Sequence, residues 1–139
     1  MLTLTRSAHT AAGLGGLLWT VKALVITARD GSFEPLEGFV FVGGLLALTT
    51  AAVLYALCLS RRFRGLARVA ATVGGALGLV AATLVAEAIG LLVIGGLASG
   101  DNIGLEQEGG ILLAGVAWMT IAVARHRREA GSQVGRAAT

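Results

Sequence analysis

Apolar residues fall into four long runs separated by short polar segments. The runs cover about residues 11–28, 35–60, 67–98 and 103–125. Each approaches or exceeds the roughly 20 residues that a helix needs to cross a bilayer core. Pro35 suits the first turn of the second helix, and Gly90 and Gly95 mark where the long third run is expected to bend or end early. The pattern predicts an all-α integral membrane bundle of four transmembrane helices in two consecutive hairpins, with a membrane domain over residues 1–128 and a short disordered cytoplasmic tail over 129–139.

The charges between the runs alternate in sign along the chain. One set of segments holds nine basic residues and a single acid, Glu129; the basic residues are Arg6, Arg61, Arg62, Arg64, Arg68, Arg125, Arg127, Arg128 and Arg136. The other set holds one basic residue, Arg29, and six acids, Asp30, Glu34, Glu37, Asp101, Glu106 and Glu108. Because lysine and arginine are retained on the cytoplasmic side in short loops, the chain is predicted to lie in the cell membrane with both termini in the cytoplasm.

Composition agrees with a membrane protein and argues against nucleic acid as a partner. The chain is 55% hydrophobic and 14% charged, whereas soluble domains are about 45–50% apolar and about 25% charged. The basic residues flank apolar runs and form no surface interleaved with aromatic residues, so anionic lipid headgroups are the expected partner of Arg61, Arg62, Arg64, Arg125, Arg127 and Arg128. Ten arginines against one lysine, with abundant alanine and glycine, suggest a bacterium.

Small residues recur at four-residue spacing in the third run. They are Ala70, Gly74, Gly78, Ala82, Ala86 and Gly90. Small residues let helix backbones approach closely in lipid, so this stripe predicts that the third helix lies at the centre of the bundle. Shorter stripes occur in the first and second runs. Alternatively, the stripe arises only because glycine and alanine are common in a chain with 21 glycines.

Lys22 and Glu87 are the ionisable residues inside the apolar runs. A charge at the centre of a membrane costs about 2.5–3.5 kcal/mol on translocon scales, so such residues face the bundle interior, find a partner or line a pathway. Measured from Arg6 and Arg68, the two lie at depths that differ by roughly 5 Å. They are therefore predicted to form a pair, with Thr83 one turn before Glu87 as a hydrogen-bond donor to its carboxylate.

Three interpretations of Lys22 and Glu87 stay open. The pair fixes which helix packs on which, or Lys22 snorkels to the nearer membrane surface, or the two residues belong to a site that relays protons or binds a cation.

Other candidates for chemistry are weak. No nucleophile stands at a recognisable spacing from a base, so no enzyme is expected. His9 and His126 make a poor metal site, the single Cys58 is expected to be a small buried residue, and the acidic segments around Glu34 and Glu108 are expected to be solvated loops. No metal and no cofactor are predicted.

Known families of small membrane proteins fit poorly. Small multidrug-resistance transporters carry a glutamate in the first helix, where this chain has Lys22, and the charge bias excludes dual-topology fluoride channels. The segment from Arg29 to Pro35 is too short for a claudin-like outer loop. In hydropathy the whole chain is similar to small four-helix membrane proteins of actinobacteria, a resemblance that rests on no diagnostic motif and implies no activity.

The function predicted from the sequence is therefore a non-enzymatic structural or interaction subunit that acts by helix–helix association, with itself or with a larger membrane partner. The alternative is a small oligomeric transporter or channel that uses Lys22 and Glu87.

Overall fold

The structure is a computed structural model that describes residues 2–29, 31, 34–98 and 100–137, with the side chains of residues 2 and 129–137 outside the description. Its elements are α1 (Leu2–Ala28), α2 (Pro35–Leu59), η1 (Ser60–Arg62), α3 (Gly65–Gly90), η2 (Leu91–Gly95) and α4 (Ile103–Ala137). The described part of the chain contains helices and no strands, which confirms the all-α class.

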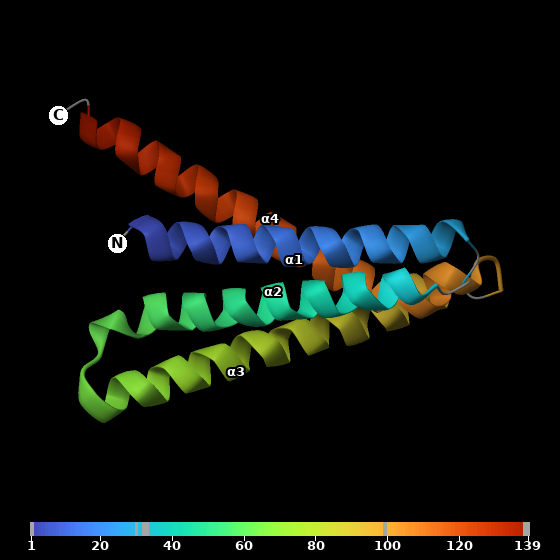
Figure 1. Cartoon of the computed structure of the whole chain (residues 1–139), viewed down its shortest axis with the longest axis horizontal. Helices are drawn as coiled ribbons and strands as arrows, with labels where there is room; N and C mark the ends of the chain where they lie inside the picture. Colours follow the sequence, from blue (N-terminus) through green and yellow to red (C-terminus); the bar gives the residue numbers. More distant parts are fainter. Residues whose placement is uncertain (1, 30, 32–33, 99, 138–139) are drawn as a thin grey trace.

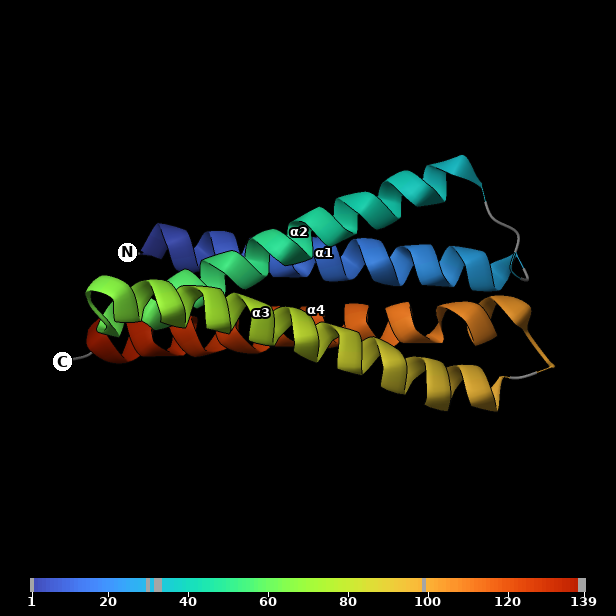
Figure 2. The same ribbon diagram turned by 90° about the horizontal axis from the view of Figure 1, so that it is seen from below.

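Successive long helices run in opposite directions, so the two termini and the α2–α3 connection lie at one end of the molecule (Figure 1). The α1–α2 and α3–α4 connections lie at the other end (Figure 2). Among the described residues, four segments are long and apolar enough to span a membrane: Thr3–Ala28, Pro35–Arg62, Gly65–Gly95 and Ile103–Arg128. The number of apolar helices thus agrees with the sequence pattern.

One helix boundary differs from the expectation, and a second change in helix geometry lies where a bend was expected. The last helix continues to Ala137, where a disordered tail was predicted from residue 129; no proline interrupts this segment, and alanine, arginine and glutamate favour helix. The third helix changes at Gly90 into a π-helical turn, η2. A π-helical turn inserts an extra residue into the helix, and here it lies at the glycines that were expected to bend the chain.

The most extensively packed helix of the bundle is α1. Its contacts are most extensive with α4 and α2, while α3 packs on α2 and α4. The buried face of α1 follows spacings of four and three residues in alternation: Ala8, Ala12, Gly15, Trp19, Lys22 and Ile26. Over these positions the spacing averages 3.6 residues, the repeat of the α-helix itself, so they stay on one face along the length of α1.

Glycines bring the backbones of α1, α2 and α4 into direct contact. A Cβ atom added at Gly16 would lie 2.6 Å from the carbonyl oxygen of Gly115, and one added at Gly115 would lie 2.7 Å from the hydroxyl oxygen of Thr20. On the other side of α1, a Cβ atom at Gly15 would lie 2.7 Å from Leu48. Any side chain at these positions would force the helices apart, so hydrogen at Cα is a packing requirement here.

The small-residue stripe of α3 does not lie at the centre of the bundle, and that prediction is wrong. Ala70, Gly74, Gly78 and Ala82 are exposed, and only the end of the stripe, at Gly90, is buried. Each four-residue step advances by about 40° around a helix with 3.6 residues per turn, so six positions wrap through about 200°. A stripe with strict four-residue spacing therefore leaves the packed face, whereas the alternating spacing of α1 stays on it.

The outward surface of α3 is apolar along its length. Leu66, Leu77 and Leu84 are exposed on it, as are Leu92 and Leu97 farther along. Soluble monomers rarely expose contiguous apolar surface on this scale. The surface is the kind that lipid chains or other helices cover.

The glycine contact predicts a position-dependent effect of one added methyl group. Gly115→Ala should destabilise the protein by about 1–3 kcal/mol, because overpacking forces the backbones of α1 and α4 to shift. Gly74→Ala is the matched control, because its Cβ atom would meet nothing within 4 Å and alanine favours helix by up to about 1 kcal/mol over glycine. Reversible unfolding of both variants in mixed micelles is the measurement. Equal stability of the two would contradict the packing described here.

Candidate functional site: a buried ion pair between α1 and α4

The start of α4 is fastened to the end of α1. The side-chain oxygen of Asn102 accepts a hydrogen bond from the backbone N–H of Leu105 at 2.8 Å, and its side-chain nitrogen donates to the carbonyl of Thr27 at 3.2 Å. Two residues on, Gly104 lies so close to α1 that a Cβ atom there would be 2.5 Å from the carbonyl oxygen of Ile26. Asn102 thus caps α4 and also fixes the axial register of α4 against α1.

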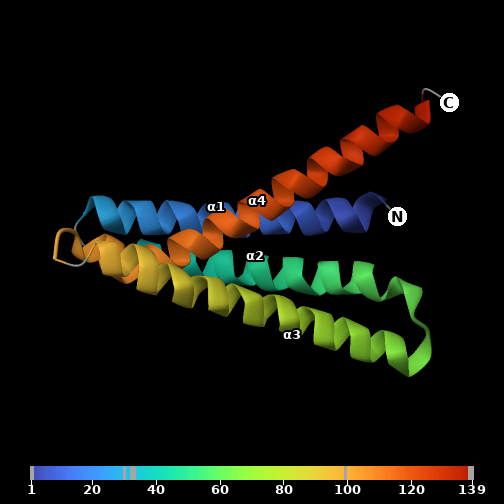
Figure 3. The same cartoon turned by 180° about the vertical axis from the view of Figure 1, so that it is seen from behind.

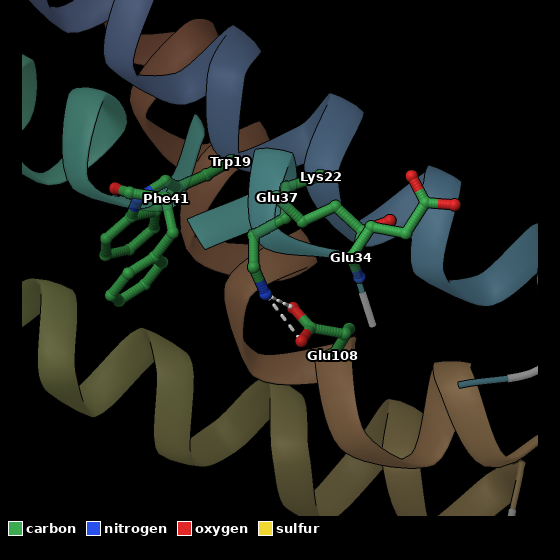
Figure 4. Close-up of polar contacts among 6 residues, drawn as sticks. All are labelled: Trp19, Lys22, Glu34, Glu37, Phe41 and Glu108. Carbon is green, nitrogen blue, oxygen red and sulfur yellow. Dashed lines mark hydrogen bonds and ion pairs between the residues drawn. The ribbon is translucent and has the colours of Figure 1, made fainter. Parts of the chain in front are cut away.

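This register of α4 along α1 places Glu108 opposite Lys22. The Lys22 Nζ atom donates to both carboxylate oxygens of Glu108, each at 2.6 Å (Figure 4). The two side chains are only 6% and 12% exposed. Charge-assisted hydrogen bonds of this length are the strong ones, and both carboxylate oxygens are used. The two charges therefore neutralise each other within the bundle.

The Phe41 ring of α2 lies over the ammonium group and is itself held by Trp19 of α1. The Lys22 Nζ atom lies 5.4 Å from the centroid of the Phe41 ring, within the range of a cation–π contact. The Phe41 ring stacks on Trp19 at a centroid separation of 5.6 Å, and the Trp19 Nε1 atom donates to the Phe41 carbonyl at 3.2 Å (Figure 4). Three helices therefore supply the surroundings of one lysine.

A second charged cluster lies nearer the α1–α2 connection. The Arg29 Nη1 atom lies 2.9 Å from Glu34 and 3.3 Å from Glu37. Glu37 is buried, and its other oxygen accepts the backbone N–H of Glu34 at 3.0 Å. A glutamate in the first turn of a helix also suits the helix dipole. Glu37 therefore departs from the expectation of a solvated loop residue, whereas Glu34 is exposed.

The predicted contact between Lys22 and Glu87 is replaced by the one with Glu108. Glu87 lies on α3, where its backbone carbonyl and Cγ atom pack against Gly110 of α4. Thr83 does not donate to Glu87: its hydroxyl donates to the Leu79 carbonyl and accepts from Trp118 Nε1, both at 2.9 Å. The physical reason is the helix arrangement, because α1 packs on α2 and α4 while α3 packs on the far sides of those two helices.

The pairing of Lys22 with Glu108 could have been predicted from the distance of each residue to its helix end. Lys22 lies six residues before the end of α1, and Glu108 lies five residues after the start of α4, so both are about 8–9 Å from the same end of the bundle. Depth measured from the arginines at the opposite end favours Glu87 instead. The segment around Glu108 is also rich in acidic residues, as solvated loops are. Its composition therefore does not indicate that Glu108 lies inside a helix.

The remaining predicted residues occupy separate places. The His9 ring lies 5.6 Å from the ring of Tyr55, and the Cys58 Sγ atom lies 3.9 Å from the Thr5 hydroxyl. The arginines at 61, 62, 64, 125, 127 and 128 are all exposed, at the end that carries the α2–α3 connection and the last turns of α4. Within the described ranges, no three His, Cys, Asp or Glu side chains are grouped so that they could hold a metal ion.

Chemically, the Lys22–Glu108 arrangement resembles a closed structural contact more than a reactive site. The ammonium group has two charged hydrogen bonds and an aromatic face, and the carboxylate is fully engaged by the ammonium. A pair of this kind is favourable only while both members are present, because either charge left alone in an apolar interior is costly.

Comparison with known proteins finds no matching family model, no matching curated protein and no matching solved structure.

The ion pair predicts a specific energetic coupling. Lys22→Met and Glu108→Gln should each destabilise the bundle, and together they should cost less than the sum, with a coupling of about 1–3 kcal/mol. Glu87→Gln is the matched control, since it removes the charge of another glutamate inside an apolar segment, and its coupling to Lys22→Met should be close to zero. Unfolding in mixed micelles gives the cycle; stronger coupling of Lys22 to Glu87 than to Glu108 would refute the observed pairing.

Proposed function

We propose that this protein is a non-enzymatic, multi-pass subunit of the cell membrane that acts by helix–helix association through the outward face of α3. The observation that carries the proposal is the exposed part of the small-residue stripe. Gly74 and Gly78 have open space where a side chain would be, and Ala70 and Ala82 extend the same surface.

Membrane physics explains why such a face would attract another helix. Lipid chains are as apolar as leucine, so helices in a bilayer associate mainly through close backbone packing at small residues. Within this chain, α1 and α4 already use that mode at Gly16 and Gly115. The glycines of α3 offer the same kind of contact on a side where no other described helix of the chain lies, which favours a second copy or a larger membrane partner as the occupant.

The Lys22–Glu108 pair supports a structural role over transport. A transporter was the alternative because Lys22 and Glu87 were predicted to share a path. With Lys22 engaged by Glu108 and only 6% exposed, that motivation is lost. The pair instead stabilises the α1–α4 core, from which α3 presents its outer face.

We further propose that both termini are cytoplasmic. The end of the bundle with the termini and the α2–α3 connection carries the exposed arginines, while Glu34, Asp101 and Glu106 lie toward the opposite end. This distribution follows the retention of basic residues on the cytoplasmic side. In this orientation, the arginines lie at the level of anionic headgroups, each worth about 1 kcal/mol near the surface.

Orientation predicts which loops a membrane-impermeant thiol reagent reaches. In a Cys58→Ser background, Asp101→Cys should be labelled in intact cells and Arg64→Cys should be labelled only after the cells are lysed. Both positions are exposed, so accessibility differs by side and not by burial. Labelling of Arg64→Cys in intact cells would overturn the orientation.

If α3 mediates association, a bulky side chain on its small-residue face should weaken binding to a second copy or to a membrane partner. Gly78→Leu should lower energy transfer between labelled copies in vesicles, or co-purification of a membrane partner, at least several-fold, while leaving the stability of the single chain unchanged. The control is Val73→Leu, which adds bulk on a different exposed flank of α3. Unchanged association in Gly78→Leu by both measurements would refute the proposal.

A further inference from the structure

A groove opens at the arginine-rich end of the bundle, where α4 leaves the other helices. Figure 3 shows α4 crossing α1 and its C-terminal part diverging from α2 and α3. The groove has a volume of about 240 Å³ and is bounded by α2, α3 and α4. Its lining combines apolar side chains with two arginines.

One part of the groove is apolar and the other is cationic. Leu79, Trp118 and Ile121 line the inner part. Arg125 and Arg128 line the part toward the end of α4, where Leu59, the last residue of α2, also lies. From Trp118 to Arg128 the helix rises by about 15 Å. The groove therefore passes from hydrocarbon-like surface to positive charge along the direction in which a phospholipid passes from acyl chain to phosphate.

The position of Arg125 is set by an aromatic contact. Its guanidinium carbon lies 5.0 Å from the centroid of the Tyr55 ring, within the range of a cation–π interaction. Tyr55 is buried and stacks in turn on Trp118, at a centroid separation of 6.3 Å. Arg125 is thus held beside the groove while remaining exposed, and its planar donors suit a phosphate.

Charge at this end favours an anionic occupant. The carboxylates of Glu34, Glu37, Asp101, Glu106 and Glu108 belong to the opposite half of the bundle. The sequence also places Glu129 next to Arg128, and its side chain lies outside the described residues. Arg61 and Arg62 add further positive charge at the α2–α3 connection but do not line the groove.

We infer that this groove is a binding site for one anionic phospholipid, with a segment of an acyl chain against Trp118 and Ile121 and the phosphate at Arg125 and Arg128. Basic pockets between transmembrane helices on the cytoplasmic side commonly take such headgroups. The volume is smaller than the roughly 300–1,000 Å³ of sites that enclose a whole small ligand, so most of the lipid stays in the bilayer. The inference rests on the proposed membrane location and is independent of association through α3.

Quenching of tryptophan fluorescence by brominated lipid tests the site, because Trp118 lines the groove. The full chain is reconstituted in vesicles of phosphatidylcholine and phosphatidylglycerol at one fixed composition. Bromine is placed on the chains of either lipid at equal mole fraction. Brominated phosphatidylglycerol should quench at least twofold more strongly. Equal quenching by the two lipids would overturn the inference.

Variants separate the groove from a diffuse charge effect. Arg125→Gln with Arg128→Gln should remove the excess quenching, whereas Arg61→Gln with Arg62→Gln, the same charge change at the same end, should keep it. Ala124→Phe keeps both arginines and fills the groove, which Ala124 also lines, and should remove the excess as well. Equal loss in both arginine pairs, or full retention in Ala124→Phe, would refute a site in the groove.

Two further measurements distinguish a lipid from a soluble anion and test membrane insertion by itself. Inorganic phosphate, compared with chloride at equal ionic strength, should leave the excess quenching unchanged; a loss specific to phosphate would show a soluble anion as the occupant and overturn the lipid. Flotation of the vesicles on a density gradient reports insertion. A chain that does not float refutes the membrane location, whereas a chain that floats without excess quenching refutes the groove alone.

Discussion

The backbone of α4 lies directly against α1, and the rest of the bundle is arranged around that contact. Gly16 meets Gly115 in the middle of the two helices, and Gly104 meets the carbonyl of Ile26 near their end. Such contacts permit little sliding, because a shift of one residue would bring a side chain where only hydrogen fits. They therefore fix how far along the bundle axis the polar groups of one helix lie from those of the other.

The Lys22–Glu108 ion pair follows from this fixed register of α1 and α4. A lysine in an apolar segment costs several kcal/mol unless it is paired, and the register of α1 and α4 brings a carboxylate to its ammonium at 2.6 Å. Phe41 of α2 then covers the charge. The pair favours this register of α1 on α4, because other registers would leave both charges buried without a partner. This accounts for two charged groups between helices that are otherwise built of small and aliphatic residues.

Close packing of α1, α2 and α4 leaves α3 with a different role. Its last turns are held against α4 by Gly90 and Gly109, where a Cβ atom on Gly90 would lie 2.5 Å from the Gly109 carbonyl oxygen. Toward its start it touches α2 near Gly75 and Ala56, and most of its surface is exposed. The same rotation of the four-residue stripe that buries Gly90 turns Gly74 and Gly78 outward. Packing inside the chain and the proposed association surface are thus two parts of one helical stripe.

Much of the helical architecture can be predicted from the sequence, because it depends on local quantities. The length of each apolar run determines a helix that can cross a bilayer, Pro35 marks the start of α2, and the glycines at 90 and 95 mark the π-helical turn. The side of the membrane predicted for each loop also comes from charges counted along the chain, and it remains a prediction. The alternating four-and-three spacing of buried residues in α1 is likewise visible in the sequence, although the stripe of α3 is the more regular of the two.

The tertiary structure decided which helices are neighbours, and that choice cannot be read from any one segment. Lys22 and Glu87 share a similar depth, yet Lys22 contacts Glu108, because α4 and not α3 packs on α1. The aromatic cover over Lys22 and the groove beside Arg125 each need side chains from two or three helices. The sequence by itself determined four apolar helices and the charges between them, since these depend on composition and spacing. The polar partners and the free faces depend on lateral packing in three dimensions, which is set by where glycines allow two backbones to touch.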